Sequence, residues 1–284
     1  MTAPAPSTPA TFPPSVKAAA ERFMHERTIA FVGDHPVYTK GEPSQYGSGV
    51  LLQVADTKFI VTAYHVVELF QKEGCSAFLG AVSTEKLVFL EGCSIRWSAK
   101  ADVAILVPPP SVFAQFPPQK RFTRLPEVAC GDPADTVGGA YGVLGYPSSE
   151  WRVDHEARQF TMWARPAFGV PYRNAGGHFD PKMHVSICFD KAANPDPNGM
   201  SGGGIWRIHQ AGVPHEQWTE SDIQLVGIEH TSIREADALY GSRMEYVLGL
   251  ILNYDPSLRP AIELQWPRKA RTDKSASWVI QEEP

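Results

Sequence analysis

The stretch NGMSGGG at residues 198–204 places one serine, Ser201, among glycines. A serine hydroxyl becomes an effective nucleophile only when a base lies within hydrogen-bond reach and N–H donors stabilise the oxyanion that forms. Gly199 can adopt backbone angles that are closed to other residues, which would let its N–H and that of Ser201 point into one small hole. A flexible Gly/Ser turn has the same local pattern, so the flanking sequence has to decide.

The segments on either side of Ser201 distinguish two folds. NPDPN at residues 194–198 contains two prolines, which exclude a central parallel strand before the serine, and GIWRI at residues 204–208 has the composition of a strand. The nucleophile elbow of an α/β-hydrolase needs a buried strand before the serine and a helix after it, with the acid and the histidine later in the chain. The flanks disfavour that fold, so we expect the base and the acid upstream.

Short apolar runs, separated by Gly, Pro and Asp, begin at Thr28. They predict strands at residues 28–32, 49–54, 58–62, 77–79, 87–90, 94–97, 103–107, 139–145, 160–164, 185–189, 204–208 and 225–228. About a dozen short strands with turns between them predict an all-β fold, and 284 residues suffice for two barrels or sandwiches side by side.

Two helices are expected beside the strands. Ser15 is predicted to cap a helix that runs to about Arg27, and an apolar stripe predicts another over residues 244–252, ending near Asp255. The expected organisation is a disordered Pro-rich tail (1–14), an N-terminal helix with a first barrel (15–135), a second barrel with a C-terminal helix (136–255) and a C-terminal tail (256–284).

Composition and charge exclude several classes of protein. The net charge of −5 disfavours a nucleic-acid partner. No apolar run approaches the roughly 18 residues of a membrane-spanning helix, and the N-terminus lacks the features of a secretory signal. We therefore expect a cytoplasmic protein that does not bind membranes. Because Cys75, Cys93, Cys130 and Cys188 show neither a CxxC pair nor zinc-ligand spacing, we expect free thiols, no metal and no cofactor.

Two residues upstream are candidates for the base and the acid. His65 follows a strand-like run directly, and Asp102 leads into another one. Together with the serine stretch, these segments resemble the chymotrypsin/trypsin-like serine peptidases, in which His, Asp and Ser occur in this order. TAYH at 62–65 resembles the family's T-A-x-H, DVAIL at 102–106 its D-[LIV]-A-[LIV]-L, and GMSGG at 199–203 its G-x-S-G-G. With weaker matches, the resemblance covers about Thr28 to Leu252.

The resemblance implies a fold and a mechanism. The fold would consist of two six-stranded antiparallel β-barrels of the trypsin-like type with a C-terminal helix. His65 would act as the base, Asp102 would orient it, and the N–H groups of Gly199 and Ser201 would bind the oxyanion. The chain would then be a serine endopeptidase that cleaves protein or peptide substrates through an acyl-enzyme; whether a regulatory partner protein controls it is left open.

The sequence also departs from the secreted members of that family. Met200 stands where those members carry an acid, so activation by a salt bridge to a new N-terminus is excluded. The cysteines beside the histidine and serine motifs are absent, which resembles the disulfide-free bacterial branch with the HtrA-like peptidases, here without a PDZ domain. Tyr64 occupies a position that is often small in the family.

The specificity of the predicted site is left open by the sequence. The resemblance places a substrate pocket near Asp196, Asn198, Ile228, Glu229 and His230. An inward carboxylate from Glu229 or Asp196 would favour basic side chains, whereas an inward His230 would favour acidic ones, and alternation along a strand prevents Glu229 and His230 from both facing the cleft. Two alternatives remain, a trypsin-like binding module that does not cleave and a serine esterase.

Overall fold

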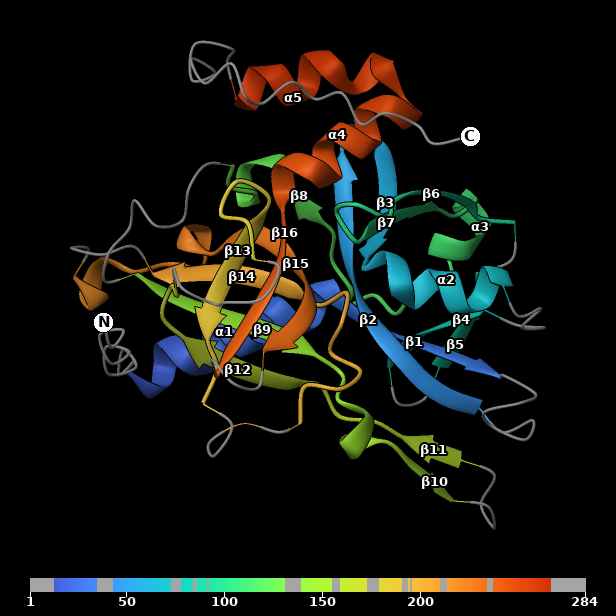
Figure 1. The fold of residues 1–284 in the computed structure, drawn as a ribbon, viewed down its shortest axis with the longest axis horizontal. Helices are drawn as coiled ribbons and strands as arrows, with labels where there is room; N and C mark the ends of the chain where they lie inside the picture. Colours follow the sequence, from blue (N-terminus) through green and yellow to red (C-terminus); the bar gives the residue numbers. More distant parts are fainter. Residues whose placement is uncertain are drawn as a thin grey trace.

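The structure is mostly β and has two halves that lie side by side (Figure 1). The computed structural model describes residues 13–34, 43–72, 78–83, 86–90, 92–130, 139–154, 159–172, 179–190, 194, 196–209, 214–233 and 237–266. The predicted N-terminal tail, most of the predicted C-terminal tail and Cys75 lie outside these residues.

The first half is one sheet with the order β5-β4-β1-β2-β3-β7-β6, in which neighbouring strands are antiparallel. Its strands are β1 (Thr28–Asp34), β2 (Pro43–Val54), β3 (Thr57–Thr62), β4 (Phe78–Ser83), β5 (Lys86–Phe89), β6 (Ser94–Ser98), β7 (Val103–Val107) and β8 (Thr123–Arg124). The short β8 pairs in parallel with β2, which makes this an eight-stranded sheet where six strands were expected.

The second half is a six-stranded antiparallel sheet with the order β12-β9-β14-β15-β16-β13. Its strands are β9 (Ala140–Gly145), β12 (Arg165–Gly169), β13 (His184–Cys188), β14 (Gly204–His209), β15 (Gln224–Ile233) and β16 (Ala238–Arg243), and a separate hairpin joins β10 (Arg152–Asp154) to β11 (Gln159–Thr161). The all-β fold class is confirmed, and the antiparallel sheets exclude the α/β-hydrolase fold.

The sequence pattern missed two strands of the six-stranded sheet of the second half, as well as β10 of the separate hairpin. β12 contains Pro166, which argues against a strand, but β12 lies at the sheet edge, where a missing N–H is tolerated. β16 contains Gly241, and a glycine in sequence is usually a sign of a turn. Here the glycine is needed inside the strand, because a Cβ would overlap the Ile228 carbonyl of the neighbouring strand β15. The strand predicted at 160–164 ends at Thr161.

The N-terminal helix α1 spans Pro14–Arg27. Its N-cap is Pro13 and no side chain caps it, so the prediction that Ser15 caps the helix is wrong: a proline at the first helical position has the required backbone angle already. Phe23 packs edge-to-face on Trp206 of β14, with ring centroids 5.7 Å apart. The helix thereby packs on the second half, although it leads directly into β1 of the first.

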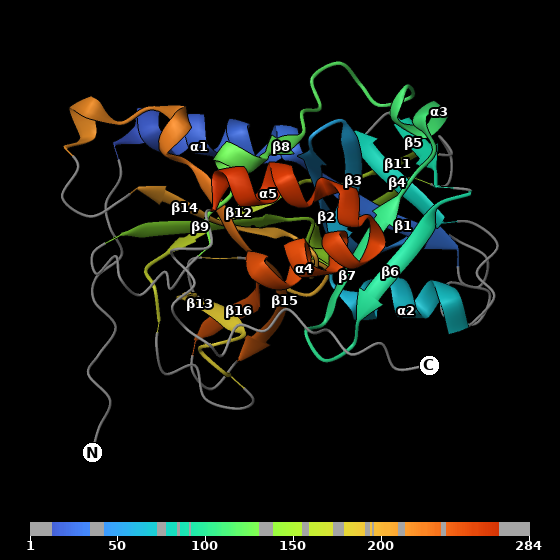
Figure 2. The same cartoon turned by 90° about the horizontal axis from the view of Figure 1, so that it is seen from above.

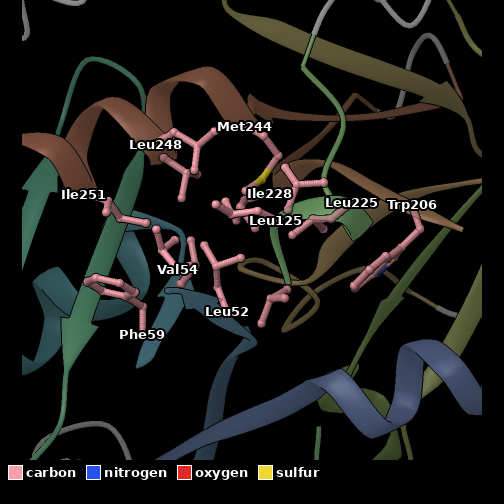
Figure 3. Close-up of a cluster of buried hydrophobic side chains, with 14 of the residues drawn as sticks. Leu52, Val54, Phe59, Leu125, Trp206, Leu225, Ile228, Met244, Leu248 and Ile251 are labelled. Carbon is pink, nitrogen blue, oxygen red and sulfur yellow. The ribbon is translucent and has the colours of Figure 1, made fainter. Parts of the chain in front are cut away.

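One hydrophobic cluster joins both halves (Figure 3). Val103 and Ile105 of β7 belong to this shared cluster, whereas the alternate residues Ala104 and Leu106 belong to the core of the first half. Because side chains alternate along a strand, β7 is buried on both faces. The shared cluster includes Leu52, Val54, Phe59, Leu125, Trp206, Leu225, Ile228, Met244, Leu248 and Ile251.

Helices cover the junction of the two halves. The predicted C-terminal helix is present as α4 (Met244–Tyr254), and α5 (Arg259–Gln265) follows where a tail was expected; both lie across the junction (Figure 2). The other described α-helices are α2 (Tyr64–Lys72) and the short α3 (Pro110–Phe113). Among the described helices, none has both the length and the apolar composition needed to cross a bilayer.

Candidate active site

His65 and Asp102 form the best-defined part of the site. His65 is the second residue of α2, and Asp102 lies in the turn before β7, which pairs with β3. The Nδ1 atom of His65 lies 2.8 Å from Oδ2 of Asp102, and the backbone N–H of His65 donates to Oδ1 at 3.0 Å. One carboxylate therefore holds both the ring and the backbone of the histidine.

The environment of Asp102 keeps it ionised. Burial acts to raise the pKa of this carboxyl, but the hydrogen bonds and charge of His65, together with the charge that His230 carries once it is protonated at low pH, hold the pKa below its ordinary value. An ionised carboxylate can only accept hydrogen bonds, so Nδ1 of His65 carries the shared proton and Nε2 is left to accept one. Asp102 also has a φ of +44°, a strained conformation of the kind that clusters at functional sites.

Ser201 is attached to the first half by a chain of hydrogen bonds. The Ser201 carbonyl accepts from the N–H of Ser48 in β2 at 2.7 Å, and the Ser48 carbonyl accepts from the hydroxyl of Thr62 at 2.7 Å. Since Thr62 precedes His65 by three residues, this chain brings the serine loop to the strand end that carries the histidine. Within the described residues the Ser201 hydroxyl makes no hydrogen bond to His65, as is common in structures without substrate.

The loop before Ser201 is held in one orientation. The Asn198 carbonyl accepts from the N–H of Ser148 at 2.7 Å, and because the peptide bond is trans, the N–H of Gly199 points to the opposite side. The Gly199 carbonyl accepts from the Gln45 side chain at 2.9 Å. In the described part of the chain, the N–H groups of Gly199 and Ser201 donate to no protein acceptor, so both remain available to an oxyanion.

A glycine after the serine is required by close backbone packing, which gives a testable prediction. Gly202 has a φ of +91°, and a Cβ there would overlap the Ser48 carbonyl and the Thr62 hydroxyl. Gly92 also has a positive φ, +74°, but a Cβ there would lie 4.0 Å from the side chain of Pro109, an ordinary contact distance. In chemical denaturation we expect Gly92→Ala to cost about 1–2 kcal/mol and Gly202→Ala about 2 kcal/mol more. Equal losses of stability in the two variants would contradict the inference that close backbone packing requires a glycine at position 202.

The five residues predicted for the substrate pocket divide into two exposed ones and three buried ones. Asp196 and Asn198 are exposed in the loop before the serine, where Asp196 accepts from the backbone and side chain of Asn198. Ile228 is fully buried in the shared cluster. Glu229 and His230 are buried too, at 2% and 9% exposure.

Glu229 brings a buried carboxyl close to the serine loop. Its backbone carbonyl accepts from the N–H of Gly202 at 2.7 Å, and its backbone N–H donates to the Gly203 carbonyl at 2.8 Å. The side chain shares a strand face with Gly227, where a Cβ would point at Val185 of β13, so it enters the interior of the second half. Burial, with a smaller contribution from the charge of Asp102, raises the pKa of Glu229 to about 8, and its buried Oε2 has no hydrogen-bond partner.

Other contacts of the site were not predicted from the sequence. Tyr64, at a position that is often small, stacks on the half-exposed Trp97 of β6, with ring centroids 5.9 Å apart. Gln45 and Ser48 hold the serine loop through the Gly199 carbonyl, and both lie in the part of β2 that precedes the strand predicted at 49–54. Among the described residues, no group of His, Cys, Asp and Glu could hold a metal ion.

Two mainly antiparallel sheets around a shared core define the chymotrypsin-like protease fold. A solved structure with this fold is the Rv3671c protease from M. tuberculosis in its active form, with a TM-score of 0.50 and 18% identity over 88% of this chain and 90% of that one. Its inactive Ser-to-Ala form has a TM-score of 0.47 and 19% identity, over 87% of this chain and 95% of that one. The tobacco etch virus protease with product has a TM-score of 0.44 and 11% identity, over 82% of this chain and 77% of that one.

The comparison is one of fold, because the identities are low. No protein-family model matches the sequence, and no curated protein matches it in a sequence search.

Proposed function

We propose that this chain is a serine endopeptidase that hydrolyses peptide bonds through Ser201, His65 and Asp102. The observation that carries the proposal is the pair of hydrogen bonds between one histidine and one partly buried carboxylate, beside a loop that presents a serine and two N–H groups without an acceptor among the described residues. The chymotrypsin-like fold supports it. The absence of cysteines from the histidine and serine motifs further supports a likeness to the HtrA-like branch.

The proposed reaction has two halves. His65 Nε2 removes the hydroxyl proton as Ser201 Oγ forms a bond to the peptide carbonyl carbon, and the carbonyl oxygen becomes an oxyanion held by the N–H groups of Gly199 and Ser201. Collapse breaks the C–N bond, and the imidazolium returns the proton to the leaving amine. Water, activated by the same histidine, then hydrolyses the acyl-enzyme.

Labelling with a fluorophosphonate tests the proposal. Covalent labelling of the wild type that is lost in Ser201→Ala and in His65→Ala is the expected result, because the probe reacts only with an activated serine. Cleavage of a casein substrate by the same preparation distinguishes a peptidase from an esterase, which would hydrolyse only ester probes. Absence of labelling and of cleavage in the wild type would favour the trypsin-like binding module instead.

We also propose that Glu229 contributes to the substrate pocket and favours basic side chains. A carboxyl without a hydrogen-bond partner in an apolar interior, next to the serine loop, is suited to bind a cation. His230, which would favour acidic residues, lies instead against Asp102. The exposed Asp196 and Asn198 would form the rim of the pocket.

The charge state of Glu229 makes this preference depend on pH. Because the pKa of Glu229 is raised to about 8, the carboxyl is mostly protonated at pH 7 and ionised at pH 9. The ratio of kcat/KM for Lys or Arg substrates to that for matched Leu substrates is therefore expected to rise between pH 7 and pH 9, and the ratio cancels the pH dependence of the triad. Glu229→Gln should lower the ratio about ten-fold at pH 9 and remove its pH dependence.

A matched charge change provides the control for Glu229. Glu216→Gln removes an exposed carboxyl from the same half and should leave the ratio unchanged. If Glu216→Gln lowers the ratio as much, net charge explains the preference. If the ratio for the wild type is flat across this pH range, Glu229 does not face the substrate.

A further inference from the structure

We propose that His230 is a positioning residue for the carboxylate of Asp102, whose Oδ2 atom it approaches together with His65. This inference rests on the proposed function and deepens it. The sequence analysis had assigned His230 to the substrate pocket, and three observations favour the carboxylate instead: its distance to Asp102, its packing and its charge state.

The two histidines converge on one oxygen atom. Nδ1 of His230 lies 3.6 Å from Oδ2 of Asp102, the same oxygen that lies 2.8 Å from Nδ1 of His65. Nδ1 of His230 is also 2.9 Å from the hydroxyl of Thr231. The backbone N–H of His65 occupies the other carboxylate oxygen. Both carboxylate oxygens thus have polar neighbours, and these contacts restrict the rotation of the carboxylate.

The His230 ring is fixed by its surroundings. Its side chain is 6% exposed. The ring packs edge-to-face on Tyr240 of β16, with centroids 5.1 Å apart, and on His184 of β13, with centroids 5.4 Å apart. These contacts come from two neighbouring strands of the second half, while Asp102 belongs to the first half. His230 therefore connects the rigid second sheet to the carboxylate across the junction.

The ring is neutral at physiological pH. Burial lowers the pKa of His230 to about 4 and outweighs the charge of Asp102, which acts to raise it; His184 and His65 lower it further. Among the described residues, Tyr240 is the remaining titratable group that packs against the ring. A neutral ring matters here, because a cation at this position would compete with the imidazolium of His65 for the same oxygen.

The neighbours of the two ring nitrogens indicate which one carries the proton. Nδ1 faces the Thr231 hydroxyl and Oδ2 of Asp102, both able to accept, whereas the buried Nε2 has no partner among the described residues. The proton is therefore better accommodated on Nδ1. In that tautomer His230 directs an N–H dipole toward the carboxylate without adding charge.

Three variants test the inference. His230→Leu removes the dipole and keeps an apolar side chain of similar bulk. His230→Asn retains a donor near the position of Nδ1 but cannot titrate. His184→Leu is the matched control, because it disturbs the packing on His230 and Tyr240 without touching Asp102. Each variant is measured on the full chain for kcat, KM and thermal unfolding.

We expect His230→Leu to lower kcat about ten-fold with KM unchanged, because the N–H dipole that lies 3.6 Å from Oδ2 no longer orients the carboxylate or favours its ionised form. His230→Asn should recover most of that loss, and His184→Leu should stay within about two-fold of the wild type. Equal losses of kcat in His184→Leu and His230→Leu would overturn the proposal, and so would a His230→Asn variant that recovers no activity. Both results would mean that kcat depends on the packing around the ring and not on the contact with Asp102. A loss seen mainly in KM would assign His230 to substrate binding and would also overturn it.

A spectroscopic readout separates this inference from the proposed function. The proton between His65 Nδ1 and Asp102 gives a downfield proton resonance that does not depend on turnover. It should shift in His230→Leu, return toward the wild-type position in His230→Asn and remain in place in His184→Leu. An unmoved resonance in His230→Leu refutes the positioning role, whereas a wild type that shows the resonance but neither cleaves nor labels refutes only the peptidase.

Discussion

Ser201→Ala is expected to lower kcat for peptide cleavage about 10⁶-fold, while thermal unfolding stays close to that of the wild type. The substitution removes only the hydroxyl, which is the proposed nucleophile. The backbone contacts of Ser201, including its carbonyl with the N–H of Ser48, do not involve the hydroxyl and are retained. Active-site titration and single-turnover cleavage give the rate, and calorimetry gives the stability.

The control for Ser201→Ala is a serine outside the site. Ser221→Ala removes an exposed hydroxyl from the same half and should leave kcat unchanged. Residual cleavage by Ser201→Ala within ten-fold of the wild type would show that another nucleophile or a contaminating protease is responsible, and the proposed mechanism would be abandoned.

Asp102→Asn is expected to lower kcat about 10⁴-fold, through the tautomer of His65. The backbone N–H of His65 donates to Oδ1, so the amide oxygen of an asparagine will occupy that position and its NH₂ will replace Oδ2. The NH₂ group donates to Nδ1 of His65, which moves the ring proton to Nε2. A ring protonated at Nε2 cannot accept the proton of the serine hydroxyl.

Fluorophosphonate labelling measures this effect without a peptide substrate. The labelling rate of Asp102→Asn should fall in parallel with kcat, and Asp56→Asn, in the exposed turn between β2 and β3, should label at the wild-type rate. A small loss in Asp102→Asn would mean that the hydrogen bonds to His65 do not set its tautomer. Asp102 would then be removed from the proposed catalytic residues, which would be Ser201 and His65 alone.

Local sequence patterns were sufficient to predict many of the strands and helices. β7 could be predicted because VAILV at residues 103–107 is β-branched and apolar, and it is indeed buried on both faces. α4 could be predicted because its apolar residues recur with the period of a helix. The edge strand β12 and the glycine-containing β16 could not, because Pro166 and Gly241 have the local character of turns, and only their neighbours in the sheet make strands of them.

The sequence by itself determined the chemical groups that the site can use, and the order in which they occur, because residue identity and short motifs are local properties. Only the tertiary structure decided how they meet. Pairing of β3 with β7 brings His65 to Asp102, and the Ser48 hydrogen bond brings the Ser201 loop to the same junction. It also decided that His230 turns toward Asp102, because strand register and close packing depend on partners that are distant along the chain.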